Sequence, residues 1–201
     1  MTYLFLDVET TGLDPDKDDL LEIAWVMVRE DLHTVNAARS FLIDHDDWAS
    51  VYNRIRENSI VHEMHMKSGL LDDMEDNELS SLDTVFRKLH TDVVNEVDLG
   101  ETVHMAGYSI HFDKAFLLAN DFSSLFTEFG TIKPLIHHRM LDLSSFKLFL
   151  KGMGLDKLVA QPHNPNPHRA LDDCYEALDY ANNLKTALNV AFPHMPKLVR
   201  A

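Results

Sequence analysis

The stretch Tyr3-Leu4-Phe5-Leu6-Asp7-Val8-Glu9, at positions 3–9, decides the fold, because it is a short apolar run that ends in acids. An apolar run of this length predicts a central strand that is buried on both faces of a sheet. Residues 10–15 (TTGLDP) follow as a turn, since Gly, Asp and Pro favour turns. Residues 20–28 (LLEIAWVMV) and 39–43 (RSFLI) predict two more strands, and the short links favour an antiparallel meander.

Helical patterns alternate with strand patterns in the rest of the chain. Residues 44–77 are rich in His, Met, Asp and Asn, and we expect helices and loops there, over one end of the sheet. The apolar spacing of residues 79–94 and 170–188 predicts helices. Shorter patterns predict strands at 102–108 and 140–142, helices at 113–120 and 144–151, and a Pro/Asn loop at 159–167. The order predicts a mixed α/β sheet covered on both faces, with one domain over 1–189 and a tail over 190–201.

Composition and charge limit the classes of function. The chain has 201 residues, of which 33 are acidic and 18 basic, and its formal net charge is −15. The 45 % hydrophobic content excludes general disorder, and only 7 Gly and 7 Pro exclude a collagen-like or low-complexity chain. Proteins that track along many phosphates usually carry a basic stripe, and the sequence shows none. Any contact with nucleic acid is therefore expected to be short, or bridged by metal cations.

The cellular location is also constrained. Cys174 is the only cysteine, so an internal disulfide is impossible, which fits a reducing compartment. The first residues lack the basic region of a signal peptide, and no apolar run approaches the length of about 20 residues that spans a bilayer. We therefore expect a cytoplasmic protein with no membrane segment.

Acidic side chains occur where a protein core does not favour them. Asp7 and Glu9 end the first strand, and their spacing of two puts both carboxylates on one side of it. Two adjacent buried carboxylates repel each other, and a bound divalent cation would offset that cost. The alternative is a strand end that simply meets solvent, where acids are common.

Two later segments carry further candidates, each with an ordinary explanation. Asp113 follows the fourth predicted strand and, taken alone, resembles a helix N-cap. His168 precedes the last predicted helix, and Asp173 lies in the early turns of that helix. Asp172 and Asp173 could simply complement the helix dipole, and His168 could cap or pack.

The joint occurrence of these residues favours a metal site. Carboxylates from a first strand, a later strand end and a C-terminal helix can converge at one place in an α/β sheet. Such oxygen ligands select hard cations such as Mg²⁺ or Mn²⁺. A pair of ions about 4 Å apart activates water and stabilises the leaving oxygen of a phosphodiester, and a nearby histidine can take the proton. The expected chemistry is metal-assisted hydrolysis of a phosphodiester.

The same residues carry a family resemblance. Asp7-Val8-Glu9-Thr10-Thr11-Gly12-Leu13, then Asp113, then the His168–Asp173 block resemble the three motifs of the DEDDh 3′–5′ exonucleases, which are DnaQ-like members of the ribonuclease H-like superfamily. Within that family the chain is most similar to the oligoribonucleases. The resemblance implies a ribonuclease H-like, mixed five-stranded sheet with one antiparallel strand, flanked by helices. It also implies trimming of short single-stranded RNA, down to dinucleotides, to 5′-mononucleotides.

Catalytic roles follow from the resemblance by position. Asp7, Glu9 and Asp173 would hold the first of two divalent cations, Mg²⁺ or Mn²⁺, and Asp7 would bridge to the second. Asp113 would support the second ion, partly through water. His168 would be the general base.

Base-binding roles are implied for two side chains. Leu13 would wedge against or between bases, and the alternative is packing against its own turn. His65 would stack on a base or sugar, and the alternative is a solvated histidine or one whose hydrogen bonds are satisfied in the core.

A phosphate-binding role is implied for a third group. Ser109, Arg139 and Ser144 would cap the 5′ phosphate of the substrate, with Arg139 as a surface ion pair the alternative. His138 stands where the family usually has an aromatic residue that reaches the substrate of the partner subunit, so the resemblance implies a homodimer.

Other functions stay open from the sequence. The same chemistry could act on single-stranded DNA or on longer RNA 3′ ends, as in proofreading subunits. A non-catalytic nucleotide-binding module is a further alternative, although all five residues of the motifs are present.

Overall fold

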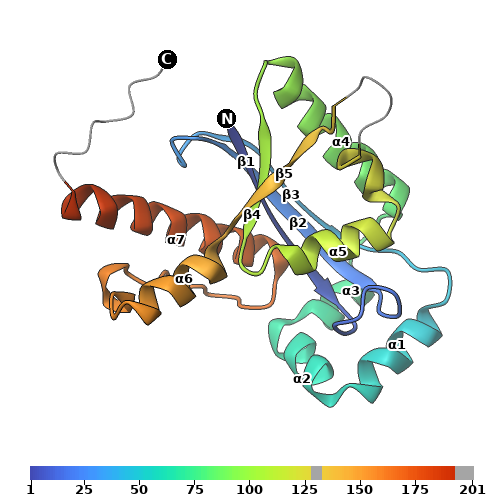
Figure 1. Cartoon of the computed structure of the whole chain (residues 1–201). Helices are drawn as coiled ribbons and strands as arrows, with labels where there is room; N and C mark the ends of the chain where they lie inside the picture. Colours follow the sequence, from blue (N-terminus) through green and yellow to red (C-terminus); the bar gives the residue numbers. More distant parts are fainter. Residues whose placement is uncertain (128–132, 193–201) are drawn as a thin grey trace.

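A twisted five-stranded sheet forms the centre of the molecule (Figure 1). The structure is a computed structural model that describes residues 1–127 and 133–192. The strand order is β3-β2-β1-β4-β5, and only β2 runs antiparallel to the others. The strands are β1 (Thr2–Thr10), β2 (Leu20–Arg29), β3 (Val35–Leu42), β4 (Val103–Gly107) and β5 (Ile136–Asp142). The prediction of a mixed five-stranded sheet with one antiparallel strand is confirmed.

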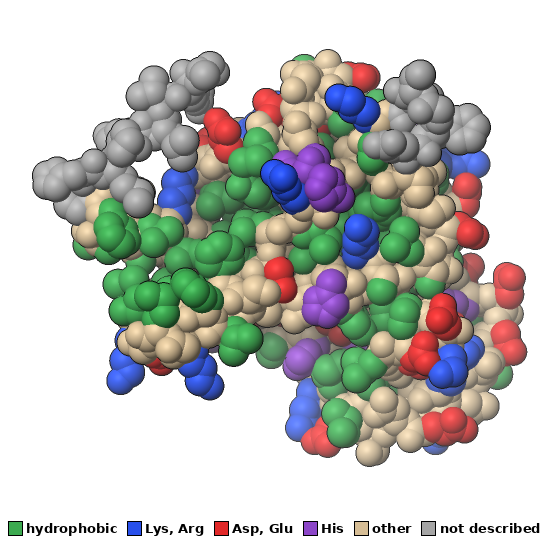
Figure 2. All heavy atoms as spheres, in the orientation of Figure 1, with side chains coloured by type: hydrophobic (Ala, Val, Ile, Leu, Met, Phe, Trp, Pro, Cys, Tyr) green, Lys and Arg blue, Asp and Glu red, His purple; other side chains and the backbone are tan. Residues whose placement is uncertain are grey.

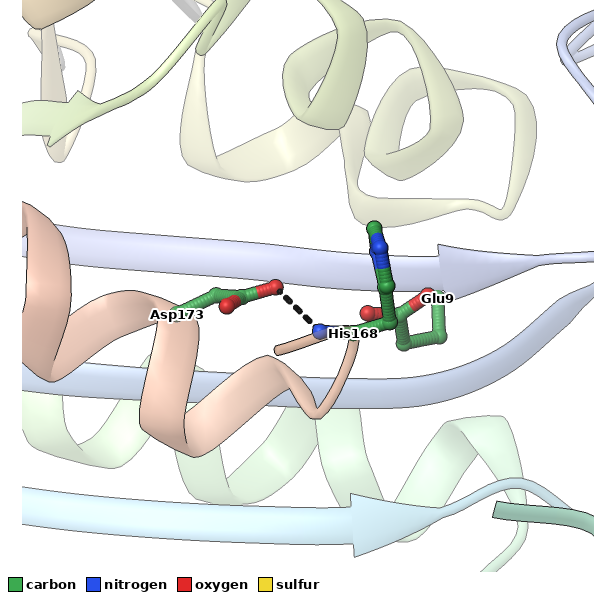
Figure 3. Close-up of side chains that lie close together, drawn as sticks. All are labelled: Glu9, His168 and Asp173. Atoms are coloured by element: carbon green, nitrogen blue, oxygen red, sulfur yellow. Dashed lines mark hydrogen bonds between the residues drawn. The ribbon is translucent and has the colours of Figure 1, made fainter. Parts of the chain in front are cut away.

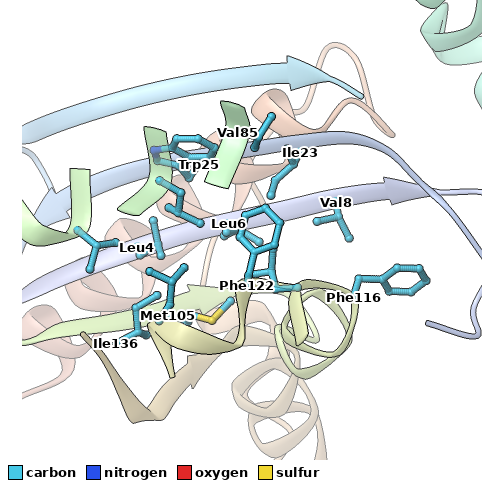
Figure 4. Packing of buried hydrophobic residues seen from close by; sticks show 14 of the residues in the cluster. Leu4, Leu6, Val8, Ile23, Trp25, Val85, Met105, Phe116, Phe122 and Ile136 are labelled. Carbon is cyan, nitrogen blue, oxygen red and sulfur yellow. The ribbon is translucent and has the colours of Figure 1, made fainter. Parts of the chain in front are cut away.

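The side chains of β1 divide between two cores because successive residues of a strand point to opposite faces. Leu4, Leu6 and Val8 pack with Trp25 and Phe122 under the helices α4 (Leu82–Asp98) and α5 (His111–Ala119) and the short helix η1 (Phe122–Leu125), as Figure 4 shows. The odd-numbered positions face α6 (Leu143–Gly152) and α7 (Ala170–Ala191), where Phe5 lies against Cys174. Asp7 and Glu9 share this second face, so the central strand carries them toward α7.

Three helices cover one end of the sheet, as expected for residues 44–77 (Figure 1). They are α1 (Trp48–Glu57), α2 (Ser59–Ser68) and α3 (Leu70–Asp76). Asn58 caps α2 by accepting the Val61 N–H, and Gly69 turns the chain between α2 and α3 with a φ of 73°. Val51, Ile55 and Leu70 pack against Leu21 of β2.

Element boundaries differ from the predicted ones at several ends. β5 begins at Ile136 rather than at residue 140, and α4 spans Leu82–Asp98 rather than residues 79–94. β3 begins at Val35 rather than at residue 39, because its first residues alternate in exposure along the sheet edge and lack a continuous apolar run. Helix α7 ends at Ala191, beyond the predicted domain boundary at 189. Most of the predicted tail, residues 193–201, lies outside the described residues. A last short helix, η2 (Asp156–Leu158), precedes the loop expected at 159–167. Within the described part of the chain, no helix has both the length and the apolar character needed to cross a bilayer.

Candidate active site

The site lies where β1 ends and begins with two acids on one face of that strand. Glu9 is only 5 % exposed, whereas Asp7 keeps part of its surface accessible. Helix α7 packs on β1 and β2, so its first turn reaches the same place. Carboxylates that are far apart in the sequence thus meet at one strand end.

Asp113 joins this group by a contact that local sequence does not reveal. Its Oδ1 accepts the backbone N–H of Val8 at 3.0 Å, between the two acids of β1, and the residue is 3 % exposed. The N-cap alternative for Asp113 is wrong, because α5 begins at His111 and Ile110 holds the cap position. The carboxylate is therefore directed at β1 and not at its own helix.

His168 and Asp173 complete the group from the start of α7 (Figure 3). His168 has a φ of 65°, which turns the chain sharply into the helix, and its backbone N–H donates to Asp173 Oδ2 at 3.2 Å. One potential ligand atom from each of Glu9, His168 and Asp173 lies within 4.8 Å of the other two. The structure thus brings together all five residues of the three predicted motifs.

The electrostatics of this cluster oppose full ionisation. Burial, followed by repulsion from Asp173 and Glu22, raises the pKa of Glu9 to about 8. Burial raises the pKa of Asp113 to about 7 and that of Asp173 to about 6. Burial and the neighbouring Asp113 also raise the pKa of Asp7 well above its usual range. Arg169 lowers the pKa of Glu9 without offsetting the burial and the repulsion, and a hard divalent cation fits this donor set.

Two residues that lie against the acid cluster were not predicted from the sequence. Glu22 on β2 pairs in register with Glu9 and is 2 % exposed. Its signal was an acid inside the apolar run LLEIAWVMV. Asn164, in the Pro/Asn loop, donates through Nδ2 to Asp173 Oδ1 and to Glu176 Oε2. The loop therefore has a direct contact with the site.

His65 does not lie where base stacking is possible, so that prediction is wrong. The residue is 0 % exposed, and its Nε2 lies 2.9 Å from the backbone oxygen of Thr10. Its Nδ1 is 3.8 Å from Glu9 Oε2. His65 is therefore a core histidine, but its hydrogen bonds are not all satisfied, because Nδ1 has no hydrogen-bond partner among the described residues. The ring contacts the end of β1 through Thr10.

Leu13 is 80 % exposed, so the alternative in which it packs against its own turn is wrong. It lines an open cavity of about 820 Å³ that begins two residues beyond Glu9. Ile60, which the sequence analysis did not single out, is 78 % exposed and lines the same cavity, together with Arg54 and Asn58. The cavity thus presents two solvent-exposed aliphatic side chains beside the acid cluster.

The predicted phosphate cap is only partly assembled. Ser109, with a φ of 49°, donates its N–H to Asp142 Oδ1 at 3.1 Å and lies 3.1 Å, Oγ to Oγ, from Ser144. Arg139 lies on β5 before Asp142, is exposed, and its guanidinium has no ion pair or hydrogen bond within residues 1–127 and 133–192. His138 is also exposed and stacks on His137 with ring centroids 4.2 Å apart. Figure 2 shows histidine side chains gathered over β4 and β5.

Known proteins resemble this chain over most of its length. A profile of the RNase_T exonucleases matches residues 4–180. The chain is 32 % identical to the oligoribonuclease of Mycobacterium bovis over 177 residues, which cover 87 % of this chain and 75 % of the relative. It is 28 % identical to a probable oligoribonuclease of Drosophila melanogaster over 180 residues, covering 87 % and 76 %.

Solved structures share the fold at lower identity. Exonuclease I aligns with a TM-score of 0.64 and 14 % identity over 96 % of this chain. A zinc-bound complex of E. coli exonuclease I with single-stranded DNA aligns with a TM-score of 0.63 and 15 % identity over 96 % of this chain. The chain spans 43 % of the length of each of these proteins. At this identity the likeness establishes the fold.

Proposed function

Because this chain belongs to the RNase_T exonuclease family, we propose that it is a metal-dependent 3′–5′ exoribonuclease. We propose that it hydrolyses short oligoribonucleotides, down to dinucleotides, to 5′-mononucleotides. The observation that carries the proposal is the convergence of Asp7, Glu9, Asp113 and Asp173 on one strand end, with His168 beside them. Likeness to oligoribonucleases supports the substrate class, and the negative charge of the chain favours a short substrate.

The donor set fits a pair of hard divalent cations, Mg²⁺ or Mn²⁺. Asp7, Glu9 and Asp173 would hold the first ion, with Asp7 bridging to the second, and Asp113 would support the second through water. When bound, such a pair lowers the pKa of the attacking water and stabilises the leaving oxygen. His168, which is exposed, would accept a proton from the attacking water at its imidazole.

The surfaces around the acid cluster fit the two ends of a short strand. Leu13 and Ile60 would hold a base between them in the cavity, since aliphatic side chains tolerate any base face. Ser109, Ser144 and the guanidinium of Arg139, which has no partner among the residues that the structure describes, would receive the 5′ phosphate. With the scissile phosphate on the cations, the distance from the cations to this 5′-phosphate site would select substrates by their number of nucleotides.

We propose that the chain acts as a homodimer. Strand β5 is an edge of the sheet, and its residues His138 and Arg139 are exposed. Helix α6, which follows directly, exposes Leu148 at 72 % and Phe149 at 65 %, and Figure 2 shows this apolar surface. A second copy seated here would cover α6 and bring His138 to the substrate of its partner. A single catalytic domain over 1–189 and a cytoplasmic location remain predictions.

The test is a timed digestion of 5′-labelled RNA of two, five and twenty nucleotides, with matching DNA, in Mg²⁺ or Mn²⁺. We compare the wild type with Asp7→Ala and with Asp83→Ala, since Asp83 is a surface acid of α4 that pairs with Arg87. Fast cleavage of the dinucleotide that is lost in Asp7→Ala and kept in Asp83→Ala supports the proposal. Preference for long strands or for DNA would point to a general exonuclease. The absence of any metal-dependent cleavage would refute the proposal that the chain is a nuclease.

A further inference from the structure

An ion pair between buried Glu22 and partly exposed Arg169 joins β2 to the start of α7. Glu22, which is 2 % exposed, accepts hydrogen bonds from Arg169 Nε at 3.2 Å and Arg169 Nη2 at 3.3 Å. It also accepts from the Ala170 N–H at 3.0 Å and from Ser40 Oγ at 2.9 Å. Both carboxylate oxygens are therefore engaged, by groups from two different segments, the start of α7 and β3.

Arg169 extends this contact to a further helix. Its Nη1 donates to Asp73 Oδ2 on α3 at 2.6 Å, so one guanidinium ties α7 to β2 and to α3. Such a fork of donors is rigid, which fixes direction as well as distance.

Arg169 lies at the point where the chain enters α7, next to a residue of the candidate site. Arg169 is the N-cap residue of α7 and follows His168, whose backbone is left-handed. A non-glycine residue keeps that conformation only where its surroundings impose it. The side chain of the cap residue accepts no hydrogen bond from the N–H groups in the first turn of α7. Glu22 instead accepts the N–H of Ala170. Its negative charge also suits the positive end of the helix.

Stability alone is a poor explanation for such a pair. Burying the charge of Glu22 and part of that of Arg169 offsets much of what their attraction returns, and apolar replacements of buried pairs are often at least as stable. A buried pair does, however, specify one geometry among several that apolar side chains would allow.

We propose that Glu22 and Arg169 are positioning residues, which hold the first turn of α7 so that His168 and Asp173 face Glu9. The proposal rests on the proposed function and adds two residues to it that do not touch the substrate. Through the Asp173 N–H, which donates to Arg169 O at 2.9 Å, the cap also fixes the turn that carries the last acid.

The test uses Glu22→Gln, Arg169→Gln and the double variant in the full chain. Arg169→Lys keeps the charge and loses the fork, and it replaces Arg169→Gln if that variant fails to fold. The matched control is Arg39→Gln, which breaks the bidentate pair with buried Asp92 between β3 and α4 and has no bond to the acid cluster. For each protein we measure kcat and KM at saturating Mn²⁺, the Kd for Mn²⁺, the Tm, and amide exchange at Ala170 and Asp173.

Positioning and electrostatics predict different patterns, because the two single variants change charge in opposite directions. If the pair positions α7, both single variants lower kcat by about 10- to 100-fold, since small misplacements are costly. The kcat of the double variant is then no lower than that of the less active single variant, and the kcat of Arg169→Lys lies between those of Arg169→Gln and the wild type. KM changes less than about threefold in each variant. Amide exchange at Ala170 and Asp173 becomes faster.

Three results would overturn the proposal. In the first, Glu22→Gln shifts the Kd for Mn²⁺ and kcat in one direction and Arg169→Gln shifts both in the other direction. The double variant then has the wild-type values. In the second, kcat stays within twofold of wild type while Tm falls as in Arg39→Gln. In the third, amide exchange at Ala170 and Asp173 is unchanged. If the wild type cleaves no strand, the proposed function fails, and amide exchange alone then decides whether the pair holds α7.

Discussion

Binding of divalent cations to the acid cluster should displace protons from it, and the number should depend on pH. Carboxylates bind metal only when ionised, so a group that is protonated in the metal-free protein releases its proton on binding. Burial raises the pKa of Glu9 to about 8 and that of Asp113 to about 7, which places both transitions near neutral pH.

The magnitude follows from these values. At pH 7 the Glu9 carboxyl is about nine-tenths protonated, the Asp113 carboxyl about half, and the Asp173 carboxyl about one-tenth. Saturation with metal at pH 7 should therefore release about 1.5 protons, and at pH 8 about 0.6. The raised pKa of Asp7 adds to both numbers. Averaged over this interval, the apparent Kd for Mn²⁺ should become about tenfold tighter from pH 7 to pH 8.

The assay is isothermal titration of Mn²⁺ into the metal-free protein at pH 7 and pH 8. Each titration is repeated in two buffers of different ionisation enthalpy, so that the slope of the heat gives the protons released. Glu63→Gln is the matched control, because Glu63 is 68 % exposed on α2 and pairs only with Lys67. That variant should reproduce the wild-type release.

A release below about 0.5 protons at pH 7 would refute the reasoning. So would a Kd that does not change between pH 7 and pH 8. Either result would mean that the acids are already ionised without metal, so that burial does not dominate the site.

Further predictions concern binding and stability. Leu13→Ala should raise KM about fivefold with kcat nearly constant, and it should change the free energy of unfolding by less than about 0.5 kcal/mol, because Leu13 is 80 % exposed; an unchanged KM would exclude it from the substrate. His65→Ala should lower the urea-measured free energy of unfolding by about 2–4 kcal/mol, since it leaves a cavity and an unpaired Thr10 oxygen; a loss below 1 kcal/mol would contradict the burial. Since the pKa of Glu9 rises from 4.5 to about 8 on folding, the metal-free protein should lose up to about 5 kcal/mol as pH rises through that range. Glu9→Gln should therefore gain stability relative to wild type between pH 5 and pH 8.5 in urea titrations, and a constant difference would count against this.

The central strand and its acids were predictable because their signals are local. An apolar run that ends in Asp-x-Glu places both carboxylates on one face, and the structure confirms this for Asp7 and Glu9. The start of α7 was predictable for the same reason, since the sequence pattern of the helix begins beside His168.

Asp113 and His65 show why other assignments were not predictable. The carboxylate of Asp113 bonds to the backbone of Val8, 105 positions earlier, and a local pattern describes only its own helix. The ring of His65 reaches the Thr10 oxygen, 55 positions away, and nothing near His65 in sequence indicates that partner.

Glu22 was missed for a different reason. A hydropathy pattern is averaged over neighbouring positions, and the neighbours of Glu22 along the chain are apolar, so the pattern indicates only a buried strand. The partner that compensates for its burial, Arg169, comes from the other end of the fold. A buried acid in an apolar strand is thus a signal to look for a distant cation, even where no partner is visible in sequence.

The order of the strands has a consequence for how the protein is made. Strand β1 is synthesised before the other strands of the sheet, yet its parallel neighbour β4 begins only at Val103, and α7 begins only at Ala170. Contacts between such distant segments form late and slowly. Until α7 has been synthesised, Asp7 and Glu9 have neither His168 nor Asp173 beside them. A nascent chain therefore lacks the complete acid cluster until the first turn of α7, with Asp173, has been synthesised and can pack on β1.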